Sequence, residues 1–384
     1  MKLRLLKFDT INPQIYLDKK IEENKELIEK MSRKELLEWI ISTRGNFSDF
    51  YTYNLNMLGW ESEEFFTNDH YIDKVADEVY GSGKRYKYFV QAVRNKIKPV
   101  KDRIKLNVIH AYVEKYKPDI ILVREQTGIP SHFWKSFDSR TLLVSRLAAP
   151  VPRHWYPSDW DLILSSTEAY KIFFELNGVP TYINQNGFDE RVLAELKDEG
   201  KIYEVTFAGG LGDRYWIKRT KCFEYVAGNL DFKWWGYNYN KKSVENNLNK
   251  TWQGLTSGLE MLQIYKNSKI VLNDYGEIAG GVGVNQRLFE TLGVGTFLLT
   301  RYSENLTKQY PANIFMTYKD EKDCVDKAKY FLSNEKEREE MALAGQKFVL
   351  ENYNYHILMK DLNEVLKESY EKKFNLNGRA HKKQ

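Results

Sequence analysis

The sequence has few cysteines, no long apolar runs and little net charge, and each of these shortages argues against a class of protein. Only two cysteines occur in 384 residues, Cys222 and Cys324, without a metal-binding spacing, which favours a reduced, cytosolic protein over a disulfide-stabilised one. No run of 18 apolar residues is present, so we expect no transmembrane helix, and the first residues lack an apolar signal core. A net charge of +5 does not by itself indicate nucleic acid.

Two ligand motifs are also absent. No GxGxxG fingerprint follows a strand-like segment, which disfavours a nicotinamide-dependent oxidoreductase. No Asp-x-Asp pair occurs in a loop suited to metal binding, so we expect no metal and no other cofactor. The chain instead has glycine-rich loops that separate strand-like from helix-like segments, and these carry most of the functional signal.

The clearest pattern lies between Lys269 and Thr300. The apolar run Ile270–Leu272 predicts a buried strand, a helix-length segment ends at Gly293, and residues 296–300 predict another strand. Between the first strand and the helix lie four glycines: Gly276, Gly280, Gly281 and Gly283. This order predicts a βαβ unit. Its loop would let backbone approach a ligand, and its helix N-terminus favours an anion such as phosphate.

The helix of this unit has two faces. Its apolar face should pack on the sheet and comprises Val284, Leu288, Phe289 and Leu292. Arg287 and Glu290 lie on the polar face three residues apart. Composition alone favours a surface ion pair of small energetic value for them. The glycine loop directly before them favours instead a place beside a ligand crevice.

A second glycine loop follows the predicted strand Glu204–Ala208 and contains Gly209, Gly210 and Gly212. Such a loop suits close approach to a diphosphate. Basic residues open the next helix, and Arg214, the nearest to the loop, is the best candidate for a phosphate contact, with Lys218 beyond it. The following strand contains Trp234 and Trp235, of which we expect at least one in the core.

In the first half, Pro118–Val123 predicts a buried parallel strand whose carboxyl end delivers Glu125. Ligands of open α/β sheets gather at such ends, so Glu125 is the best candidate for a catalytic base. His132 and Asp159 are weaker candidates. A structural role is an equal alternative for each of these residues.

The segment from Lys84 to Lys105 holds nine Lys or Arg residues and one acid, Asp102, with an interleaved apolar stripe. The favoured interpretation is an amphipathic helix with a solvated basic face. The alternative is a surface that meets anionic lipid or an anionic acceptor.

The stretch NQRLFETLGVGTFLLT, preceded by YKNSKIVLND, resembles the C-terminal core of the CgeB-like (spore maturation protein type) glycosyltransferases, most clearly over residues 207–355. The resemblance implies the GT-B fold, an α/β architecture of two Rossmann-like domains that face each other across a cleft, with a C-terminal helix crossing back. It implies that Glu290 binds the donor ribose, that nearby basic groups bind the diphosphate, and that the nucleobase lies near Gly236 and Tyr237. Many retaining relatives carry a second glutamate where this chain has Val282, so the stereochemical outcome is not predicted.

We therefore expect an acceptor domain at residues 1–190, a donor domain at 191–355, and a crossing helix with a basic tail at 356–384. The expected reaction moves a sugar, in the simplest case a hexose, from a nucleotide-diphosphate sugar to a glycan, lipid-linked or protein acceptor. It would take place in the cytoplasm, with peripheral contact at an anionic membrane and without nucleic acid. The alternatives are a nucleotide-sugar epimerase of the same architecture and a non-catalytic binding module. The candidate donor-binding residues are Gly209, Gly210, Arg214, Lys218, Gly236, Tyr237, Gly281, Asn285, Arg287 and Glu290.

Overall fold

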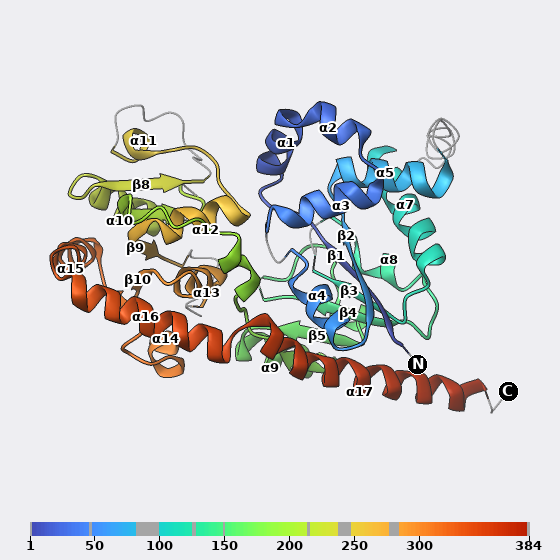
Figure 1. Ribbon diagram of the computed structural model, residues 1–384. Helices are drawn as coiled ribbons and strands as arrows, with labels where there is room; N and C mark the ends of the chain where they lie inside the picture. The colour runs from blue at the N-terminus through green and yellow to red at the C-terminus, as the bar shows by residue number, and fades with distance from the viewer. Residues whose placement is uncertain are drawn as a thin grey trace. The chain divides into compact units, whose positions relative to one another are not determined.

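The computed structural model describes residues 2–45, 48–81, 100–124, 128–148, 150–212, 216–236, 247–275 and 284–381 (Figure 1). For residues 100–103 and 376–381 it describes the backbone alone. The chain forms two compact units. Unit 1 comprises Met1–Asn184 and Met359–Gln384, and unit 2 comprises Gln185–Leu358. Each unit is an α/β structure built on one parallel sheet.

Unit 1 has a six-stranded sheet with the order β2-β1-β3-β4-β5-β6, in which every described pairing is parallel. Its strands are β1 (Arg4–Asp9), β2 (Glu61–Phe66), β3 (Ile120–Val123), β4 (Leu142–Arg146), β5 (Leu162–Ser165) and β6 (Thr181–Ile183). Its helices are α1 (Gln14–Glu23), α2 (Lys25–Lys30), α3 (Arg33–Ser42), α4 (Phe50–Met57), α5 (Asp69–Tyr80), α7 (Val100–Tyr116), α8 (Ser131–Trp134), η1 (Pro157–Asp159) and α9 (Glu168–Leu176).

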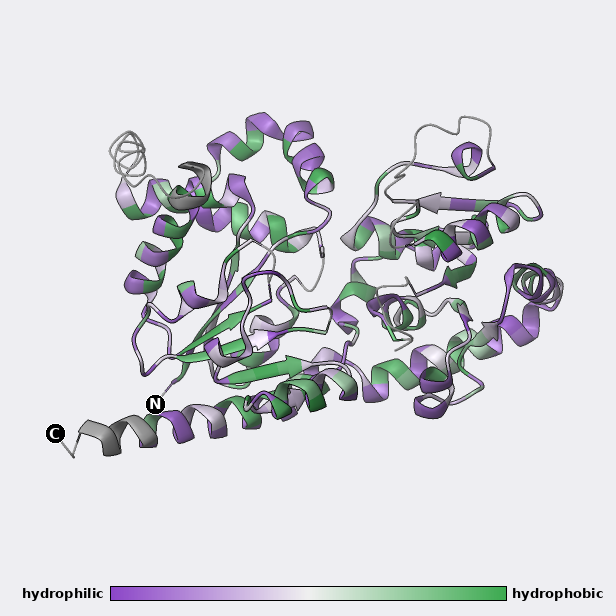
Figure 2. Cartoon of the chain, turned by 180° about the vertical axis from the view of Figure 1, so that it is seen from behind, coloured by the Kyte–Doolittle hydropathy of each residue, from purple (hydrophilic) through white to green (hydrophobic). Residues whose placement is uncertain are grey.

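The inner strands β3 and β5 of unit 1 form where the sequence is continuously apolar, because a parallel strand is covered on both faces, whereas β1 and β2 also contain charged residues. All four residues of β3 are buried, and Phe8 of β1 packs against Trp134 of α8 with ring centres 4.6 Å apart. Figure 2 shows several strands of this unit in the hydrophobic colour, whereas its helices mix hydrophilic and hydrophobic residues. Helix α3 begins with a capping box in which Ser32 and Glu35 satisfy each other's backbone N–H groups.

Unit 2 has a five-stranded parallel sheet with the order β11-β10-β9-β7-β8. Its strands are β7 (Tyr203–Ala208), β8 (Phe232–Trp235), β9 (Ser268–Asn273), β10 (Phe297–Arg301) and β11 (Met316–Tyr318). Its helices are η2 (Glu190–Ala194), α10 (Ile217–Ala227), α11 (Asn247–Thr251), α12 (Gly258–Lys266), α13 (Gln286–Gly293), α14 (Glu304–Gln309), α15 (Glu321–Ser333) and α16 (Glu335–Asn352). Trp234 and Trp235 are both buried, which confirms the core position expected for at least one of them.

The last helix, α17 (Tyr355–His381), begins in unit 2 and continues in unit 1. Within unit 1 it is fixed by polar contacts as well as by packing. Asn363 Oδ1 accepts from Trp60 Nε1 at 2.7 Å, and Lys373 Nζ pairs with Asp161 at 2.6 Å. The C-terminal helix that crosses from the second domain to the first is therefore present, as expected.

Most of the basic segment Lys84–Lys105 lies outside the described residues, so its expected role in lipid or acceptor contact stays a prediction. Among the described helices, none combines the length and the apolarity needed to cross a bilayer.

Candidate functional site: the carboxyl edge of the second sheet

The five strands of unit 2 end at the same edge of the sheet, because all run parallel. There β7 leads into a turn at Gly209 and Gly210, which we call the first glycine turn, and β8 leads into Gly236. The Gly209 N–H donates to Trp235 O at 2.9 Å. Gly209 and Gly236 have φ angles of +154° and +136°, which side chains rarely tolerate.

These glycines are required by close contact as well as by conformation. A Cβ on Gly236 would lie 2.1 Å from Gly209 O, and one on Gly209 would lie 2.6 Å from Arg287 Nη2. A Cβ on Gly210 would lie 2.7 Å from the Trp216 ring. The structure therefore brings Gly209, Gly236 and Arg287 into one tightly packed group at this edge.

Arg287 does not lie on an exposed polar face as the sequence pattern suggested. Its Nη1 donates to Asn273 Oδ1 at 2.7 Å, and its Nε donates to Ala208 O at 3.0 Å and to the Tyr265 hydroxyl at 3.2 Å. Among the residues that the structure describes, no ion pair joins Arg287 to Glu290. Of the two interpretations of Arg287 and Glu290, the structure does not show the surface ion pair, because acceptors from β7, β9 and α12 occupy the guanidinium.

Asn285 lies directly before α13 and joins the same network. Its Nδ2 donates to Asn273 Oδ1 at 2.9 Å, while its Oδ1 is buried without a hydrogen-bond partner in the part of the chain that the structure describes. Asn273 Nδ2 in turn donates to Thr300 Oγ1 at 3.1 Å. The ends of β7, β9 and β10 are thus connected by side chains that meet around Asn273.

Glu290 lies one turn into α13 and is partly buried. Burial raises the pKa of its carboxyl to about 7, and the nearby Arg287 opposes this rise. Within the described residues, its carboxylate has no hydrogen bond, which suits an acceptor that waits for a ligand hydroxyl. A carboxyl in this state titrates near neutral pH.

The structure says less about the remaining donor-binding candidates of unit 2. Lys218 is exposed on α10. Arg214, Tyr237 and Gly281 lie outside the described residues, so their expected donor contacts stay predictions.

Arg219, one of the basic residues that open the predicted helix but not the one chosen for a phosphate contact, is buried at the same edge. Arg219 donates from Nη1 to Asp274 O at 3.1 Å and from Nη2 to Gly210 O. The carboxylate of Asp274 accepts from Arg301 Nε at 2.5 Å and from the Tyr318 hydroxyl at 3.1 Å. A signal for its burial was present in the sequence. Arg219 lies three and four residues before the apolar Cys222 and Phe223, which places it on the buried face of α10.

In unit 1, two of the catalytic candidates can be placed. His132 is exposed on α8, and Asp159 is buried at the end of η1. Asp159 accepts from Ser131 Oγ at 2.5 Å and pairs with Lys135 at 3.0 Å, so both its oxygens are engaged. These contacts favour a structural role for Asp159. Glu125 lies outside the described residues.

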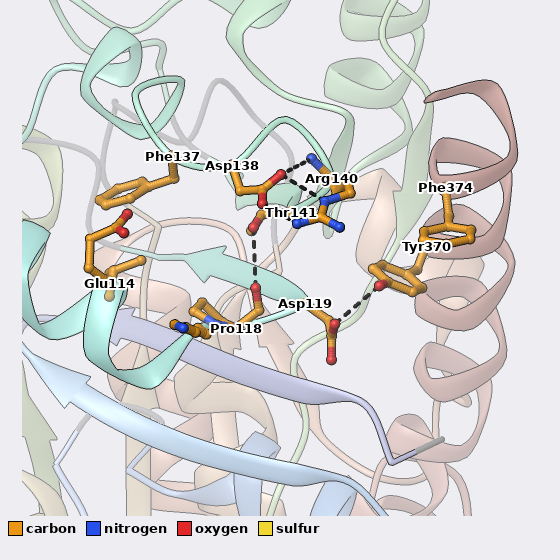
Figure 3. Close-up of a pocket in the computed structure, with 11 residues that line it drawn as sticks. Glu114, Pro118, Asp119, Phe137, Asp138, Arg140, Thr141, Tyr370 and Phe374 are labelled. Atoms are coloured by element: carbon orange, nitrogen blue, oxygen red, sulfur yellow. Dashed lines mark hydrogen bonds and ion pairs between the residues drawn. The ribbon is translucent and has the colours of Figure 1, made fainter. Parts of the chain in front are cut away.

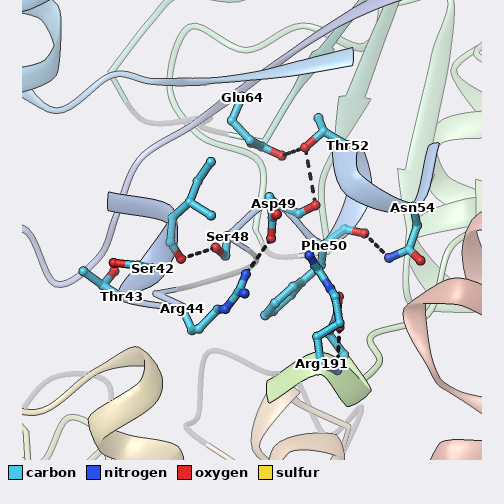
Figure 4. Close-up of polar contacts among 12 residues, drawn as sticks. Ser42, Thr43, Arg44, Ser48, Asp49, Phe50, Thr52, Asn54, Glu64 and Arg191 are labelled. Atoms are coloured by element: carbon cyan, nitrogen blue, oxygen red, sulfur yellow. Dashed lines mark hydrogen bonds and ion pairs between the residues drawn. The ribbon is translucent and has the colours of Figure 1, made fainter. Parts of the chain in front are cut away.

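Sequence reasoning missed a buried charge cluster in unit 1. Lys7, fully buried in β1, pairs with Glu64 at 2.6 Å and with Asp9 at 3.4 Å, and Asp9 pairs with Arg124 at 2.8 Å. Thr52 Oγ1 donates to Glu64 at 2.8 Å, a contact visible in Figure 4 beside the separate Arg44–Asp49 pair. The signal was present, because one lysine inside an otherwise apolar strand needs a buried partner.

Residues 218–364 match a family model described as glycosyl transferase-like, which supports a glycosyltransferase. No curated protein sequence matches the chain. Sucrose-phosphate synthase from Thermosynechococcus elongatus is similar in structure, with a TM-score of 0.56, 9% identity, and coverage of 96% of this chain and 99% of that one. Anabaena Alr3699/HepE, solved with UDP-glucose, gives 0.55 at 10% identity over 95% and 100%. UDP-GlcNAc 2-epimerase from Neisseria meningitidis, bound to UDP-GlcNAc, gives 0.51 at 10% identity over 96% and 100%.

The fold is GT-B. Its two Rossmann-like units are the expected pair, and the family match covers α10 to the first part of α17. These similarities do not show whether the chain belongs to the CgeB-like subfamily.

One pocket of this GT-B chain lies away from either carboxyl edge. A cavity of about 360 Å³ opens in unit 1 beside Asp119 and Thr141, which directly precede β3 and β4 (Figure 3). Tyr370 of α17 donates to Asp119 at 3.1 Å, and Arg140 donates to the neighbouring Asp138 at 2.7 Å. None of the candidate site residues lines this pocket, which lies at the amino ends of the strands.

Proposed function

We propose that the protein is a glycosyltransferase that binds a nucleotide-diphosphate sugar at the carboxyl edge of the unit 2 sheet. The observation that carries this proposal is the packing of Gly209, Gly236 and Arg287 at the ends of β7 and β8. Glycines in such a turn let an anion come close to the backbone, and the guanidinium groups of Arg287 and Arg219 beside the turn favour a diphosphate there. The glycosyl transferase-like match over residues 218–364 supports the same reading.

The roles of the donor residues follow from their placement. Glu290 would accept hydrogen bonds from the donor ribose, since its carboxyl has no hydrogen bond among the described residues. Gly209 and Gly210 would face the diphosphate, with Arg214 and Lys218 as candidates for direct phosphate contacts. Gly236 and Tyr237 would border the nucleobase, and Gly281 and Asn285 would face the sugar phosphate from the second glycine loop.

Unit 1 would supply the acceptor side, and the acceptor is a glycan, a lipid-linked glycan or a protein. Glu125 remains the first candidate for a base, because it directly follows Arg124 at the carboxyl end of β3. His132 is exposed on α8 and is the next candidate. The proposal includes transfer of a hexose, independence of divalent metal, and a cytoplasmic reaction with peripheral contact at anionic membranes.

A donor screen tests the proposal. Purified full-length protein is titrated with UDP, GDP, ADP and their hexose derivatives, with binding read by thermal shift and calorimetry and turnover by release of the nucleoside diphosphate. We expect one nucleotide to bind far more tightly than the others, and its sugar derivative to be hydrolysed slowly without acceptor. Absence of binding across this panel would contradict the proposal.

An epimerase is the second candidate, since two of the similar solved structures are described as UDP-N-acetylglucosamine 2-epimerases, one of them as putative. Incubation with the donor alone separates the two functions. An epimerase converts the nucleotide sugar to its stereoisomer with the diphosphate linkage intact or releases the epimerised sugar, whereas a transferase releases the unchanged sugar.

A further inference from the structure

The edge of the Arg287 guanidinium that usually holds a phosphate is occupied by the protein's own backbone. Nε and Nη2, the paired donors used in bidentate contacts, both donate to Ala208 O. Nη1 donates to Asn273 Oδ1 at 2.7 Å, and the guanidinium carbon lies 4.5 Å from the Phe207 ring centre. In the structure, this edge of Arg287 therefore binds the end of β7 and not an external ligand.

The peptide group that Arg287 holds is the one that opens the first glycine turn. The Ala208 carbonyl and the Gly209 N–H belong to the same peptide, and the N–H donates to Trp235 O at 2.9 Å. Arg287 and β8 thus hold this peptide from opposite sides. Two residues later, Gly210 O accepts from Arg219, so the Leu211 N–H of that peptide points away from Arg219.

The turn is closely packed. A Cβ on Gly209 would lie 2.6 Å from Arg287 Nη2, and a Cβ on Gly236 would lie 2.1 Å from Gly209 O. Because the packing is this close, removal of the guanidinium leaves both an unsatisfied carbonyl and a void beside a glycine with a positive φ. A turn with that freedom would have to be ordered again each time a ligand binds.

We propose that Arg287 is a positioning residue, which fixes the first glycine turn in the shape that receives the donor diphosphate and acts through the Ala208 carbonyl. The choice of ligand rests on the proposed function. We call the hold of Arg287 on this turn the lock. It consists of contacts within unit 2 and exists without a ligand. This distinguishes Arg287 from the direct diphosphate contact that the sequence alone suggested for it.

Two variants, Arg287→Lys and Arg287→Gln, test the lock. The matched control is Arg338→Lys, since Arg338 is a buried arginine of the same unit that also donates to a backbone carbonyl, Phe331 O at 2.8 Å. Amide hydrogen exchange of residues 203–212 is measured without nucleotide, and affinity for the nucleoside diphosphate from the donor screen by calorimetry. Both Arg287 variants should exchange about tenfold faster in this segment. They should bind about tenfold to hundredfold more weakly, and the control should match wild type.

The outcomes separate the lock from direct contact. Weaker binding with unchanged exchange would show that Arg287 contacts the donor, and it would overturn this inference while the proposed function stands. Unchanged exchange and unchanged affinity would also overturn it. If wild type binds no nucleoside diphosphate, the proposed function fails, and the exchange measurement alone decides the lock.

A milder variant covers the case in which both Arg287 variants unfold. Tyr265→Phe removes only the 3.2 Å bond to Nε and leaves the guanidinium in place. We expect about twofold to tenfold faster exchange of residues 203–212 and an affinity loss of similar size. Exchange equal to wild type in this folded variant would overturn the lock.

Discussion

The carboxyl edges of the two parallel sheets hold buried charge in different ways. In unit 1, charge meets charge, since Lys7 pairs with Glu64 and Asp9, and Asp9 pairs with Arg124. In unit 2, Arg301 also pairs with Asp274, but Arg287 donates to a carbonyl, an amide oxygen and a hydroxyl, all neutral. Neutral acceptors stabilise a guanidinium without cancelling its field. The comparison indicates that unit 2 retains positive potential for an anion, whereas the unit 1 cluster is largely self-neutralised.

The largest effect should come from breaking the unit 1 cluster. Lys7→Met leaves Glu64 and Asp9 buried near each other without their shared cation, which should cost about 3–5 kcal/mol of the free energy of unfolding. Denaturant unfolding of the full chain, followed by tryptophan fluorescence, measures the loss. The double variant Lys7→Met/Glu64→Gln should recover part of it, because one of the two carboxylates is then neutral. Equal stability of Lys7→Met and wild type would contradict the cluster's role.

The second effect concerns the close packing in unit 2. Gly236→Ala places a Cβ 2.1 Å from Gly209 O, whereas Gly254→Ala, also at a positive φ, meets nothing within 4 Å. We expect Gly236→Ala to cost about 1–3 kcal/mol more than this control and to weaken nucleotide binding strongly. Thermal unfolding and calorimetry on both variants measure this. Equal effects would mean that backbone strain, and not contact with the turn, decides the outcome.

The two edges also differ in how far the sequence predicts them. The strands and the first glycine turn follow from local signals, such as apolar runs bounded by glycines, and the second glycine loop, residues 276–283, lies outside the described residues. The role of Arg287 does not, because its acceptors Ala208 and Asn273 are 79 and 14 residues away in the chain. Helical periodicity placed it on a polar face. Only the folded sheet shows that this face meets the ends of β7 and β9.

The same reason explains the unit 1 cluster. Lys7 and Glu64 are separated by 57 residues and meet because β1 and β2 pair in parallel. A lysine in an apolar strand signals a buried partner, but the sequence does not say which acid supplies it. Local patterns therefore predict elements well and predict side-chain partners between elements poorly.

The third prediction compares the titration of the wild type with that of Glu290→Gln. Burial raises the pKa of Glu290 to about 7, so the folded state holds this proton more tightly than the unfolded state, whose pKa is near the ordinary 4.5. The contribution of Glu290 to stability is therefore present at low pH and is lost as pH rises through about 7.

Glu290→Gln should consequently be as stable as wild type at pH 5 and more stable at pH 8, as measured by thermal unfolding. Nucleotide affinity should show the opposite trend, because the ionised carboxylate is the better acceptor for ribose hydroxyls. In wild type it should fall below pH 7, and in Glu290→Gln it should be weak and nearly independent of pH. Burial also raises the pKa of Glu64 to about 7, and Glu64 titrates in both proteins. Subtracting one pH profile from the other therefore cancels its contribution. Parallel pH profiles would show that Glu290 does not titrate in this range.

The smallest expected effect is that of chelation. The carboxylate of Asp274, whose backbone carbonyl accepts from Arg219, is committed to Arg301 and Tyr318, and Arg287 and Arg219 place positive charge behind the turn. These guanidinium groups can stabilise the leaving diphosphate in the role that a divalent ion has in other transferases. Turnover of the nucleotide sugar should therefore change less than about twofold in EDTA and should not rise with added magnesium or manganese. Complete loss of turnover in EDTA, with recovery by either ion, would mean that the guanidinium groups do not stabilise the leaving diphosphate sufficiently. The carboxyl edge of unit 2 would then need a divalent metal to bind the donor, unlike the edge of unit 1.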